Sequence, residues 1–584
     1  MKRLLQYMAH YKARYACGGL CLLATASLVM AVPALIQRII DSLAADSGEP
    51  GRVGLYTALI VAIALAQALV RTVSRTLIFN AGRNVEYDLR SDLFRHLTTL
   101  PQTYYHHQRT GDLMSRLVND IGAVRLLLGL GILTFINTPV YCAMAFSLMA
   151  LMNWKLTLAA MVPFPLILWV VKHYSHAMME ATFKTQERLA DMSSFVQENL
   201  AGIDVVKTYV REDARAQAFA GLNESFKDQS MEVANLRGKV FPFIRVVSSL
   251  GVLIVLYYGG TLVVAGDLSL GQLAAFIGYL HILAWPIMAL GWMISIYQRG
   301  KAAMLRLGEI LETVSTIRSP ANPVRVDKVS GEIRFENVQF TYPLPGNDRQ
   351  TGRPILCNIN FTVPAGCRLG IIGRTGSGKS TLVALVARMF DATEGRVSVD
   401  GVDVRDWDLG QLRSNIGFVP QDPFLFSSSI EENISFARES VGADEMSRLV
   451  EMAGLDADLA EFPQGLETQV GERGVALSGG QKQRLTLARA IARNPAILIL
   501  DDSLSSVDSA TEKRILDELD EAMQNRTSII ISHRVSAVQR ADVIAVMDDG
   551  AIVETGSHDE LVAAGGFYAQ LFQRQRIAEE LEAM

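Results

Sequence analysis

Two long stretches of this chain are almost free of formal charge. Residues 121–171 contain only Arg125 and Lys155, and residues 246–298 contain only Asp267. A helix that crosses a bilayer needs about 20 apolar residues, and an ionised side chain is costly at membrane depth. Each stretch is long enough for two membrane-spanning helices, and this constrains the fold more than any other feature of the sequence.

Six apolar segments, in three pairs, are predicted to span a membrane. They are residues 16–37, 55–78, 127–150, 155–174, 244–266 and 271–297. The alternative is a set of buried helices in a soluble protein, and three near-uncharged pairs argue against it. The composition agrees, because 50% of the 584 residues are hydrophobic and only 20% are charged, whereas soluble domains carry about 25% charged residues.

The composition also excludes several classes of protein. The hydrophobic content excludes a disordered chain. A net charge of −5 gives no basic footprint for general nucleic-acid binding. Five cysteines are too few for a disulfide scaffold in a chain of this length.

Basic residues flank the predicted spans on one side. The start of the chain and the loops after spans two and four are rich in Lys and Arg, whereas the loops after spans one, three and five hold few. Basic flanks stay in the cytoplasm, so both termini are predicted to lie there, with the spans in a bacterial-type inner (plasma) membrane.

The two basic loops, residues 79–126 and 175–243, have helical charge patterning, so the membrane helices are expected to extend into the cytoplasm. Each loop is interrupted, around residues 101–111 and around Gly202. A short transverse helix there would present a contact to a cytoplasmic partner; the alternative is a solvated connector.

The composition changes after the sixth predicted span. Residues 318–323 (Arg-Ser-Pro-Ala-Asn-Pro) have the composition of a linker. Beyond them, β-rich segments alternate with helical ones, which is typical of an α/β domain.

A phosphate-binding loop is predicted in this domain. The apolar strand 368–373 leads into residues 373–380, Gly-Arg-Thr-Gly-Ser-Gly-Lys-Ser, which fit G-x-x-x-x-G-K-[ST] in the required strand–loop–helix context. Glycines let backbone N–H groups approach phosphates. Lys379 is predicted to reach the β- and γ-phosphates, and Ser380 to bind Mg²⁺.

A second nucleotide-binding element is the apolar strand that ends in Asp501 and Asp502, where a carboxylate can serve Mg²⁺. Residues 477–481, Leu-Ser-Gly-Gly-Gln, precede this strand. A lone Ser-Gly-Gly would be an ordinary turn, but its position before an acidic strand makes it diagnostic.

With these elements the chain resembles the ATP-binding cassette transporters over nearly all of its length. The resemblance implies that residues 477–481 are the signature sequence, which completes the nucleotide site of a second chain. It implies that Tyr342 stacks on adenine and that Asp508 is the D-loop acid. Gln421 would sense Mg²⁺ and water, and His533 would contact the γ-phosphate.

The implied functional residues fall into four groups. ATP would be bound by Tyr342, Gly373, Arg374, Thr375, Gly376, Ser377, Gly378, Lys379, Ser380 and Thr381, and Mg²⁺ by Ser380, Gln421 and Asp501. The catalytic residues would be Asp502, His533 and Gln421, and the signature in trans would be Leu477, Ser478, Gly479, Gly480 and Gln481.

Six spans ahead of one cassette resemble an exporter half-transporter. The expected fold is a membrane α-helical bundle with six transmembrane helices and long cytoplasmic extensions, fused to an α/β P-loop ATP-binding cassette. The expected domains are residues 1–318 for the spans, 319–330 for a linker, 331–572 for the cassette and 573–584 for a tail. One cassette supplies one phosphate loop and one signature, so the chain must pair.

One residue departs from the family pattern. Hydrolytic sites of this family normally have Glu after the Mg²⁺ aspartate, and here that residue is Asp502. Its carboxylate is shorter by one C–C bond, about 1.5 Å, and a misplacement on the order of 1 Å can cost about 100-fold in rate. We therefore expect a weakly hydrolytic ATP site and a heterodimer with a partner that supplies Glu. The alternative is a homodimer with two slow sites.

The cargo is only weakly specified. Spans three to six are rich in Met and aromatic residues, which suit export of hydrophobic or amphipathic small molecules, although helix packing and lipid contact explain them as well. His281 is an ionisable side chain at membrane depth and therefore a candidate functional group; the alternative is a hydrogen bond to a neighbouring helix. A lipid flippase and an ATP-gated channel or regulator share the same motifs and stay open as alternatives.

Overall fold

The computed structural model describes every residue except 45–49, 344–352, 439, 472–476, 504–508 and 583–584. The chain forms two compact units. The helical unit comprises Met1–Leu97 and Gly111–Glu312, and the α/β unit comprises Thr98–Thr110 and Thr313–Met584.

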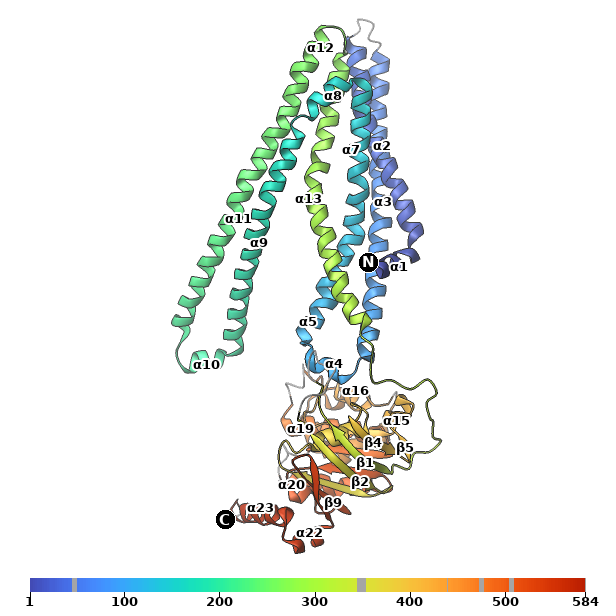
Figure 1. Cartoon of the computed structure of the whole chain (residues 1–584), viewed down its shortest axis with the longest axis vertical. Helices are drawn as coiled ribbons and strands as arrows, with labels where there is room; N and C mark the ends of the chain where they lie inside the picture. Colours follow the sequence, from blue (N-terminus) through green and yellow to red (C-terminus); the bar gives the residue numbers. More distant parts are fainter. Residues whose placement is uncertain (45–49, 344–352, 439, 472–476, 504–508, 583–584) are drawn as a thin grey trace. The chain divides into compact units, whose positions relative to one another are not determined.

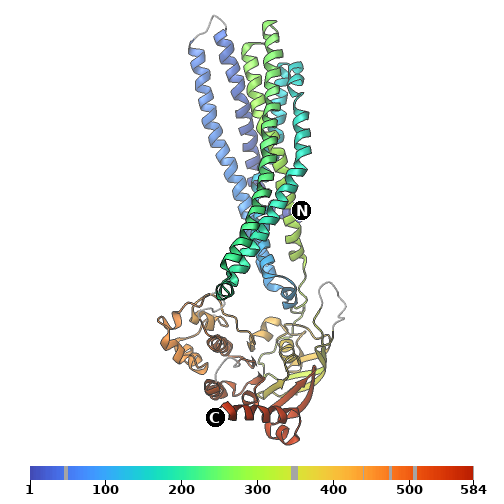
Figure 2. The same cartoon turned by 90° about the vertical axis from the view of Figure 1, so that its left-hand side faces the viewer.

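Long helices dominate the N-terminal part of the chain (Figures 1 and 2). They are α1 (Lys2–His10), α2 (Lys12–Ala44), α3 (Pro50–Thr99), α5 (Thr110–Ser115), α6 (Ile121–Leu126), α7 (Ile132–Met152), α8 (Trp154–Met161), α9 (Phe164–Ala201), α10 (Ile203–Thr208), α11 (Glu212–Ile254), α12 (Gly260–Val264) and α13 (Leu270–Glu312). Three π-helical turns connect some of them: Arg116–Asp120 (η1), Leu127–Gly131 (η2) and Val255–Gly259 (η3).

All six predicted spans fall within this helical region. In the part of the chain that the structure describes, four helical segments are long and apolar enough to cross a membrane: Lys12–Ala44, Gly51–Thr99, Thr110–Met152 and Glu212–Val264. Leu270–Leu283 is a shorter apolar helix. The helices also continue through the two long loops, as the charge patterning predicts, and α10 lies across the ends of α9 and α11 (Figure 1).

Close backbone approach holds α13 against α2. A Cβ atom on Gly271 would lie 2.2 Å from the carbonyl oxygen of Gln37, so only glycine fits there. The Gly271 amide donates to Asp41 Oδ1 at 2.9 Å. Further along, the buried Tyr279 hydroxyl donates to the Met30 carbonyl at 3.1 Å. These contacts fix the register of the two helices.

The α/β unit contains two sheets. Its strands are β1 (Ile333–Phe340), β2 (Leu356–Val363), β3 (Arg368–Gly373), β4 (Glu394–Val399), β5 (Val402–Asp403), β6 (Ile416–Val419), β7 (Ile497–Asp501), β8 (Thr527–Ile531), β9 (Val543–Asp548) and β10 (Ala551–Gly556). One sheet is antiparallel with the order β2-β1-β4-β5. The other has the order β10-β9-β3-β8-β7-β6 and is parallel except for β10.

The same unit also contains helices, some of which pack on its strands. They are α4 (Gln102–His107), α14 (Lys379–Val386), α15 (Leu409–Ser414), α16 (Ile430–Ser435), α17 (Ala443–Met452), α18 (Asp456–Glu461), α19 (Gly479–Ala492), α20 (Ser509–Met523), α21 (Val535–Val538), α22 (His558–Ala564) and α23 (Phe567–Glu582), with a 3₁₀ turn at Gly465–Glu467 (η4). The strands β7 and β8 are buried along their whole length, as parallel strands covered on both faces must be.

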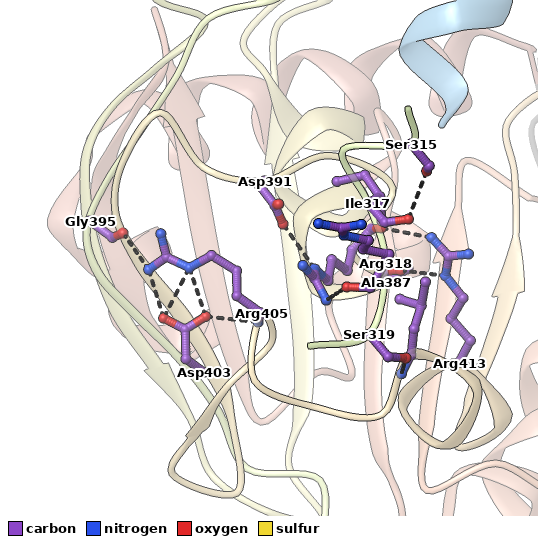
Figure 3. Close-up of polar contacts among 12 residues, drawn as sticks. Ser315, Ile317, Arg318, Ser319, Ala387, Asp391, Gly395, Asp403, Arg405 and Arg413 are labelled. Carbon is purple, nitrogen blue, oxygen red and sulfur yellow. Dashed lines mark hydrogen bonds and ion pairs between the residues drawn. The ribbon is translucent and has the colours of Figure 1, made fainter. Parts of the chain in front are cut away.

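The predicted linker is hydrogen-bonded to the α/β unit. The buried Arg388 donates to the Arg318 carbonyl at 3.1 Å, and the Leu409 amide donates to Ser319 Oγ at 2.9 Å (Figure 3). Val324 then forms an isolated parallel β-bridge with Trp407. The linker is therefore attached to this unit, while the expected domain boundaries stay a prediction.

Candidate nucleotide-binding site

The predicted phosphate loop connects β3 to α14. Gly376 and Gly378 have φ angles of +85° and +95°, in the left-handed region that favours glycine. A Cβ atom on Gly373 would lie 2.1 Å from the Met547 carbonyl oxygen. The glycines of the motif are therefore required by the backbone of this loop and by its close packing on β9.

Lys379 lies at the first position of α14 and bends back over the loop. Its Nζ donates to the carbonyls of Gly373 and Arg374, both at 2.9 Å. Burial lowers the pKa of the Lys379 ammonium, and the nearby Asp502 and Asp501 carboxylates oppose that shift. The ammonium is thus held in the concave side of the loop, where an anionic group would replace the carbonyls as its partner.

Two hydroxyl groups and an aromatic cluster surround this loop. Ser377 Oγ is buried and has no hydrogen-bond partner among the described residues. The Tyr342 hydroxyl lies 3.1 Å from Thr381 Oγ, and its ring packs edge-on against Phe340 and Phe390. Tyr342 is 39% exposed, so one part of the ring is open to a ligand.

Asp501 ends the buried strand β7 beside the start of α14. Ser380 Oγ donates to Asp501 Oδ1 at 3.1 Å, and Asp501 is only 4% exposed. Burial raises the pKa of Asp501, the neighbouring Asp502 adds to the shift, and Ser380 and Lys379 oppose it. A buried carboxylate of this kind gains a great deal from a cation.

Asp502 and His533 form a pair at the ends of β7 and β8. His533 Nδ1 lies 3.0 Å from Asp502 Oδ1 and 3.3 Å from Oδ2. Asp502 has a φ of +48°, which Asp and Asn adopt more readily than other L residues. The Asp502 carboxylate is thereby directed to the histidine of its own chain.

The residues fit a nucleotide with Mg²⁺. A cradle for phosphate oxygens is formed by the buried Ser377 hydroxyl, which has no hydrogen-bond partner among the described residues, by the Lys379 ammonium, and by glycines with positive φ angles. The Ser380 hydroxyl and the Asp501 carboxylate are oxygen ligands of the type that Mg²⁺ prefers.

The signature residues begin α19. Ser478 Oγ accepts from the backbone amide of Gln481 at 3.2 Å, and Gln481 Oε1 accepts from the backbone amide of Ser478 at 2.8 Å. These two bonds form a reciprocal capping box. Gln481 Nε2 also donates to Asp458 at 2.9 Å, and Leu477 is buried. In the described part of the chain, no hydrogen bond joins residues 477–481 to the phosphate loop.

The structure thus brings together Lys379, Ser380, Asp501, Asp502 and His533. Thr375 and Arg374 lie in the same loop, and Gln421 is exposed on the loop that follows β6. Asp508 lies outside the described residues.

Two neighbours of the site were not predicted from the sequence. The His106 ring, on α4, has its centroid 6.4 Å from that of Tyr342 and 6.1 Å from that of Phe390. Gln575, on α23, contacts the loop that carries His533. Neither residue belongs to a motif, so no local signal could have identified it.

The comparisons with known proteins agree with this geometry. Residues 15–287 match the family described as the ABC transporter transmembrane region, and residues 356–505 match the family described as ABC transporter. The probable multidrug resistance ABC transporter ATP-binding/permease protein YheI of Bacillus subtilis is 36% identical over 583 residues, covering 99% of this chain and 98% of the relative. The multidrug resistance-like ATP-binding protein MdlA of Escherichia coli is 36% identical over 570 residues, covering 97% and 95%.

A solved structure extends the likeness to the whole fold. The structure of a bacterial Atm1-family ABC exporter with ATP bound matches with a TM-score of 0.81 at 26% identity, covering 96% of this chain and 99% of that chain. Both units and their order are shared with these proteins. The chain therefore belongs to the ATP-binding cassette exporters, integral membrane ATPases that fuse a transmembrane region to an ATP-binding cassette.

Proposed function

We propose that this chain is one half of a heterodimeric exporter of hydrophobic or amphipathic small molecules, with a weakly hydrolytic ATP site built on its own phosphate loop. The names of its relatives in Bacillus subtilis and Escherichia coli support the multidrug type of transport. The single observation that carries the proposal of slow hydrolysis is the Asp502–His533 pair.

ATP would be held by the phosphate loop with Mg²⁺. The glycines and Lys379 would bind phosphate oxygens, and Ser380, Asp501 and Gln421 would hold the cation. When bound, Mg²⁺ neutralises charge on the phosphate oxygens. Tyr342 would support the adenine with its exposed ring.

Asp502 would be a poor general base for two reasons. Its side chain is shorter than Glu by about 1.5 Å. Its carboxylate is also held within 3.0 Å of His533, so it orients that histidine instead of extending toward a nucleophilic water. His533 would contact the γ-phosphate.

The signature residues would serve the site of the partner. Ser478 and Gln481 are pre-ordered by their capping box, and the start of α19 directs backbone N–H groups outward. A partner with Glu after its Mg²⁺ aspartate would thereby obtain a complete hydrolytic site. Both termini and the cassette would be cytoplasmic, and ATP-driven closing of the two cassettes would drive alternating access.

The first test is ATPase activity of the purified chain alone in lipid nanodiscs. We expect slow turnover, and we expect Asp502→Glu to raise it. The gain in reach is partly offset because Glu is less favoured than Asp at a φ of +48°. Robust activity of the unmodified chain, abolished by Lys379→Ala, would show that the site is competent and that the degenerate-site proposal is wrong. A stable homodimer with slow turnover would contradict the heterodimer and support a homodimer with two slow ATP sites.

The second test concerns the cargo. A groove of about 500 Å³ in the helical unit supports an apolar ligand. It is lined by Pro139, Cys142, Ala143, Phe146, Met161, Phe164 and Leu283. Drug-stimulated ATPase activity with drug uptake into inverted vesicles would support drug export. Stimulation by phospholipid with lipid translocation and no drug uptake would instead identify a flippase.

A further inference from the structure

The C-terminal helix α23 is fixed to the body of the α/β unit at its first residues. Glu554, on β10, accepts from the Phe567 amide at 2.6 Å and from the Tyr568 amide at 3.2 Å, which satisfies two of the otherwise unpaired amides of a helix start. The Tyr568 ring is fully buried, and its hydroxyl lies 2.8 Å from His558 Nδ1. The helix therefore begins from a rigid anchor.

The same face of α23 carries Gln575. Tyr568 and Gln575 are seven residues apart, two helical turns, so their side chains lie on one face about 10 Å apart along the axis. Burial of Tyr568 thus directs Gln575 toward the body of the unit. Gln575 is half-buried, while its neighbour Gln573 is exposed.

Gln575 makes two hydrogen bonds to the backbone that directly follows the His533 side chain, one on either side of Arg534. Its Nε2 donates to the His533 carbonyl at 2.7 Å, and its Oε1 accepts from the Val535 amide at 2.7 Å. Val535 is the first residue of α21, and the preceding Arg534 offers no side-chain cap. The side-chain amide of Gln575, on α23, therefore caps the start of α21 and holds the backbone that follows His533.

The rest of the His533 loop is fixed from the other direction. The Ser532 amide donates to the Ile371 carbonyl of β3 at 3.1 Å, and Ser532 Oγ accepts from the Arg534 amide at 3.0 Å. The His533 ring itself is largely open, with 54% of its side chain exposed. Its direction depends on the Asp502 carboxylate, 3.0 Å from Nδ1, and on the backbone that carries the ring, and Gln575 fixes the part of that backbone that follows His533.

We infer that Gln575 is a positioning residue for His533 and acts through the backbone without touching the nucleotide. The inference rests on the proposed role of His533 at the γ-phosphate. A second contact joins α23 to the phosphate loop. The Arg374 guanidinium lies 5.4 Å from the centroid of the Phe567 ring, and the Arg374 carbonyl is one of the two that accept from Lys379. The C-terminal helix therefore contacts both loops that frame the site.

Positioning and mere stabilisation predict different kinetics. A residue that directs His533 toward the developing charge affects the chemical step, so its loss lowers kcat and leaves nucleotide binding by the phosphate loop intact. A residue that only stabilises the fold lowers the melting temperature and reduces the amount of active protein, without a selective effect on kcat.

The experiment uses the full-length chain in lipid nanodiscs, in the Asp502→Glu background where turnover at this site is expected to be higher. Gln575→Ala is compared with Gln573→Ala, an exposed glutamine two residues away on the same helix. We expect Gln575→Ala to lower kcat roughly tenfold, as for a displacement of less than 1 Å, with KM for ATP changed less than about twofold. Gln573→Ala should match the parent.

A conservative variant and an exchange measurement complete the test. Gln575→Glu keeps the acceptor for the Val535 amide and loses the donor to the His533 carbonyl, so its kcat should lie between the parent and Gln575→Ala. Hydrogen–deuterium exchange should rise in peptides that contain Val535 in Gln575→Ala, and remain unchanged in peptides from β3 and α14.

Three results would overturn the inference. Gln575→Ala could equal Gln573→Ala in kcat, or it could lower ATP affinity and melting temperature together with kcat, or exchange at Val535 could stay unchanged. His533→Ala separates the proposed role of His533 from the positioning role of Gln575. If His533→Ala leaves turnover intact, the proposed role of His533 is wrong. If His533→Ala abolishes turnover and Gln575→Ala does not lower it, only the positioning role of Gln575 is wrong.

Discussion

The two units of this exporter use their buried polar groups differently. In the cassette, buried side chains satisfy specific partners: the fully buried Asn433 exchanges two hydrogen bonds with the backbone of Phe426, at 2.9 and 3.0 Å. In the transmembrane unit, the contacts between α2 and α13 depend on close backbone approach at Gly271 and on hydroxyl-to-carbonyl bonds such as that of Tyr279. At these positions the cassette depends on the hydrogen bonds of a particular side chain, and the helical unit depends on how closely two helices approach each other.

This difference predicts where substitutions affect activity and where they affect stability. A small chemical change at a cassette carboxylate should abolish turnover without unfolding the protein. A small steric change at a helix contact should destabilise the helical unit and leave the nucleotide site intact.

The largest effect is expected for Asp501→Asn. The amide oxygen can still accept from Ser380, but the charge that would hold Mg²⁺ is lost, so ATP turnover should fall by roughly 100-fold or more. Because burial raises the pKa of Asp501, its ionised form is unfavourable in the nucleotide-free fold. Removal of that charge should leave the melting temperature of the nucleotide-free chain unchanged or higher, as measured by differential scanning fluorimetry.

The pH dependence follows from the sign of that shift. A carboxyl with a raised pKa in the folded state favours the folded nucleotide-free chain when protonated, and this contribution is lost as the pH rises through the folded pKa. The difference in melting temperature between Asp501→Asn and the parent should therefore be largest at neutral pH and should shrink as the solution is acidified. A lower melting temperature of Asp501→Asn at pH 7 would contradict this account.

A steric change gives the next largest effect. Gly271→Ala places a Cβ atom 2.2 Å from the Gln37 carbonyl oxygen, so α13 and α2 must separate, and we expect a loss of about 1–3 kcal/mol in the free energy of unfolding. The matched control is Gly19→Ala on α2, where a Cβ atom meets nothing within 4 Å. Thermal unfolding in nanodiscs should separate the two variants, while equilibrium ATP binding should be the same for both. Equal stability would show that this helix contact is not as close as described.

The same contrast explains how much could be predicted from the sequence. The phosphate loop and Asp501 were predictable because their chemistry requires given residue types at fixed spacing. The helical unit was predictable in outline, because charge-free length alone identifies an apolar helix. Gly271 touches a neighbouring helix and Gly19 does not. This difference depends on how the helices pack against each other, and no local sequence pattern encodes it.

The contact of Gln575 with His533 was missed for a related reason. It joins residues 42 positions apart in the sequence and uses a glutamine in the segment expected to be a C-terminal tail. Likewise, Arg318 and Ser319 have the composition of a linker, yet the Arg318 carbonyl and the Ser319 hydroxyl accept hydrogen bonds from the cassette. Turn-forming residues predict an irregular path, and they do not predict whether that path is free or bound.

The smallest effect concerns that bound linker. Arg388 is 4% exposed and donates to the Arg318 carbonyl and, through Nε, to Asp391 Oδ1 at 3.0 Å. Arg388→Lys keeps the charge but cannot make both bonds, so one of the two acceptors loses its partner, and we expect a loss of about 1 kcal/mol. Limited proteolysis should show faster cleavage between residues 313 and 330, because the linker is released more often.

The control for this prediction is Arg325→Ala, in the same linker. Arg325 pairs with Asp408 at 3.4 Å, but its side chain is 75% exposed, and exposed ion pairs contribute little to stability. Cleavage rates for Arg325→Ala should equal those of the parent. If both variants were cleaved equally fast, surface charges would hold the linker, and the buried Arg388 would have no special role in attaching it. If only Arg388→Lys were cleaved faster, the cassette's dependence on specific buried side chains would extend into the segment that leads to the membrane unit.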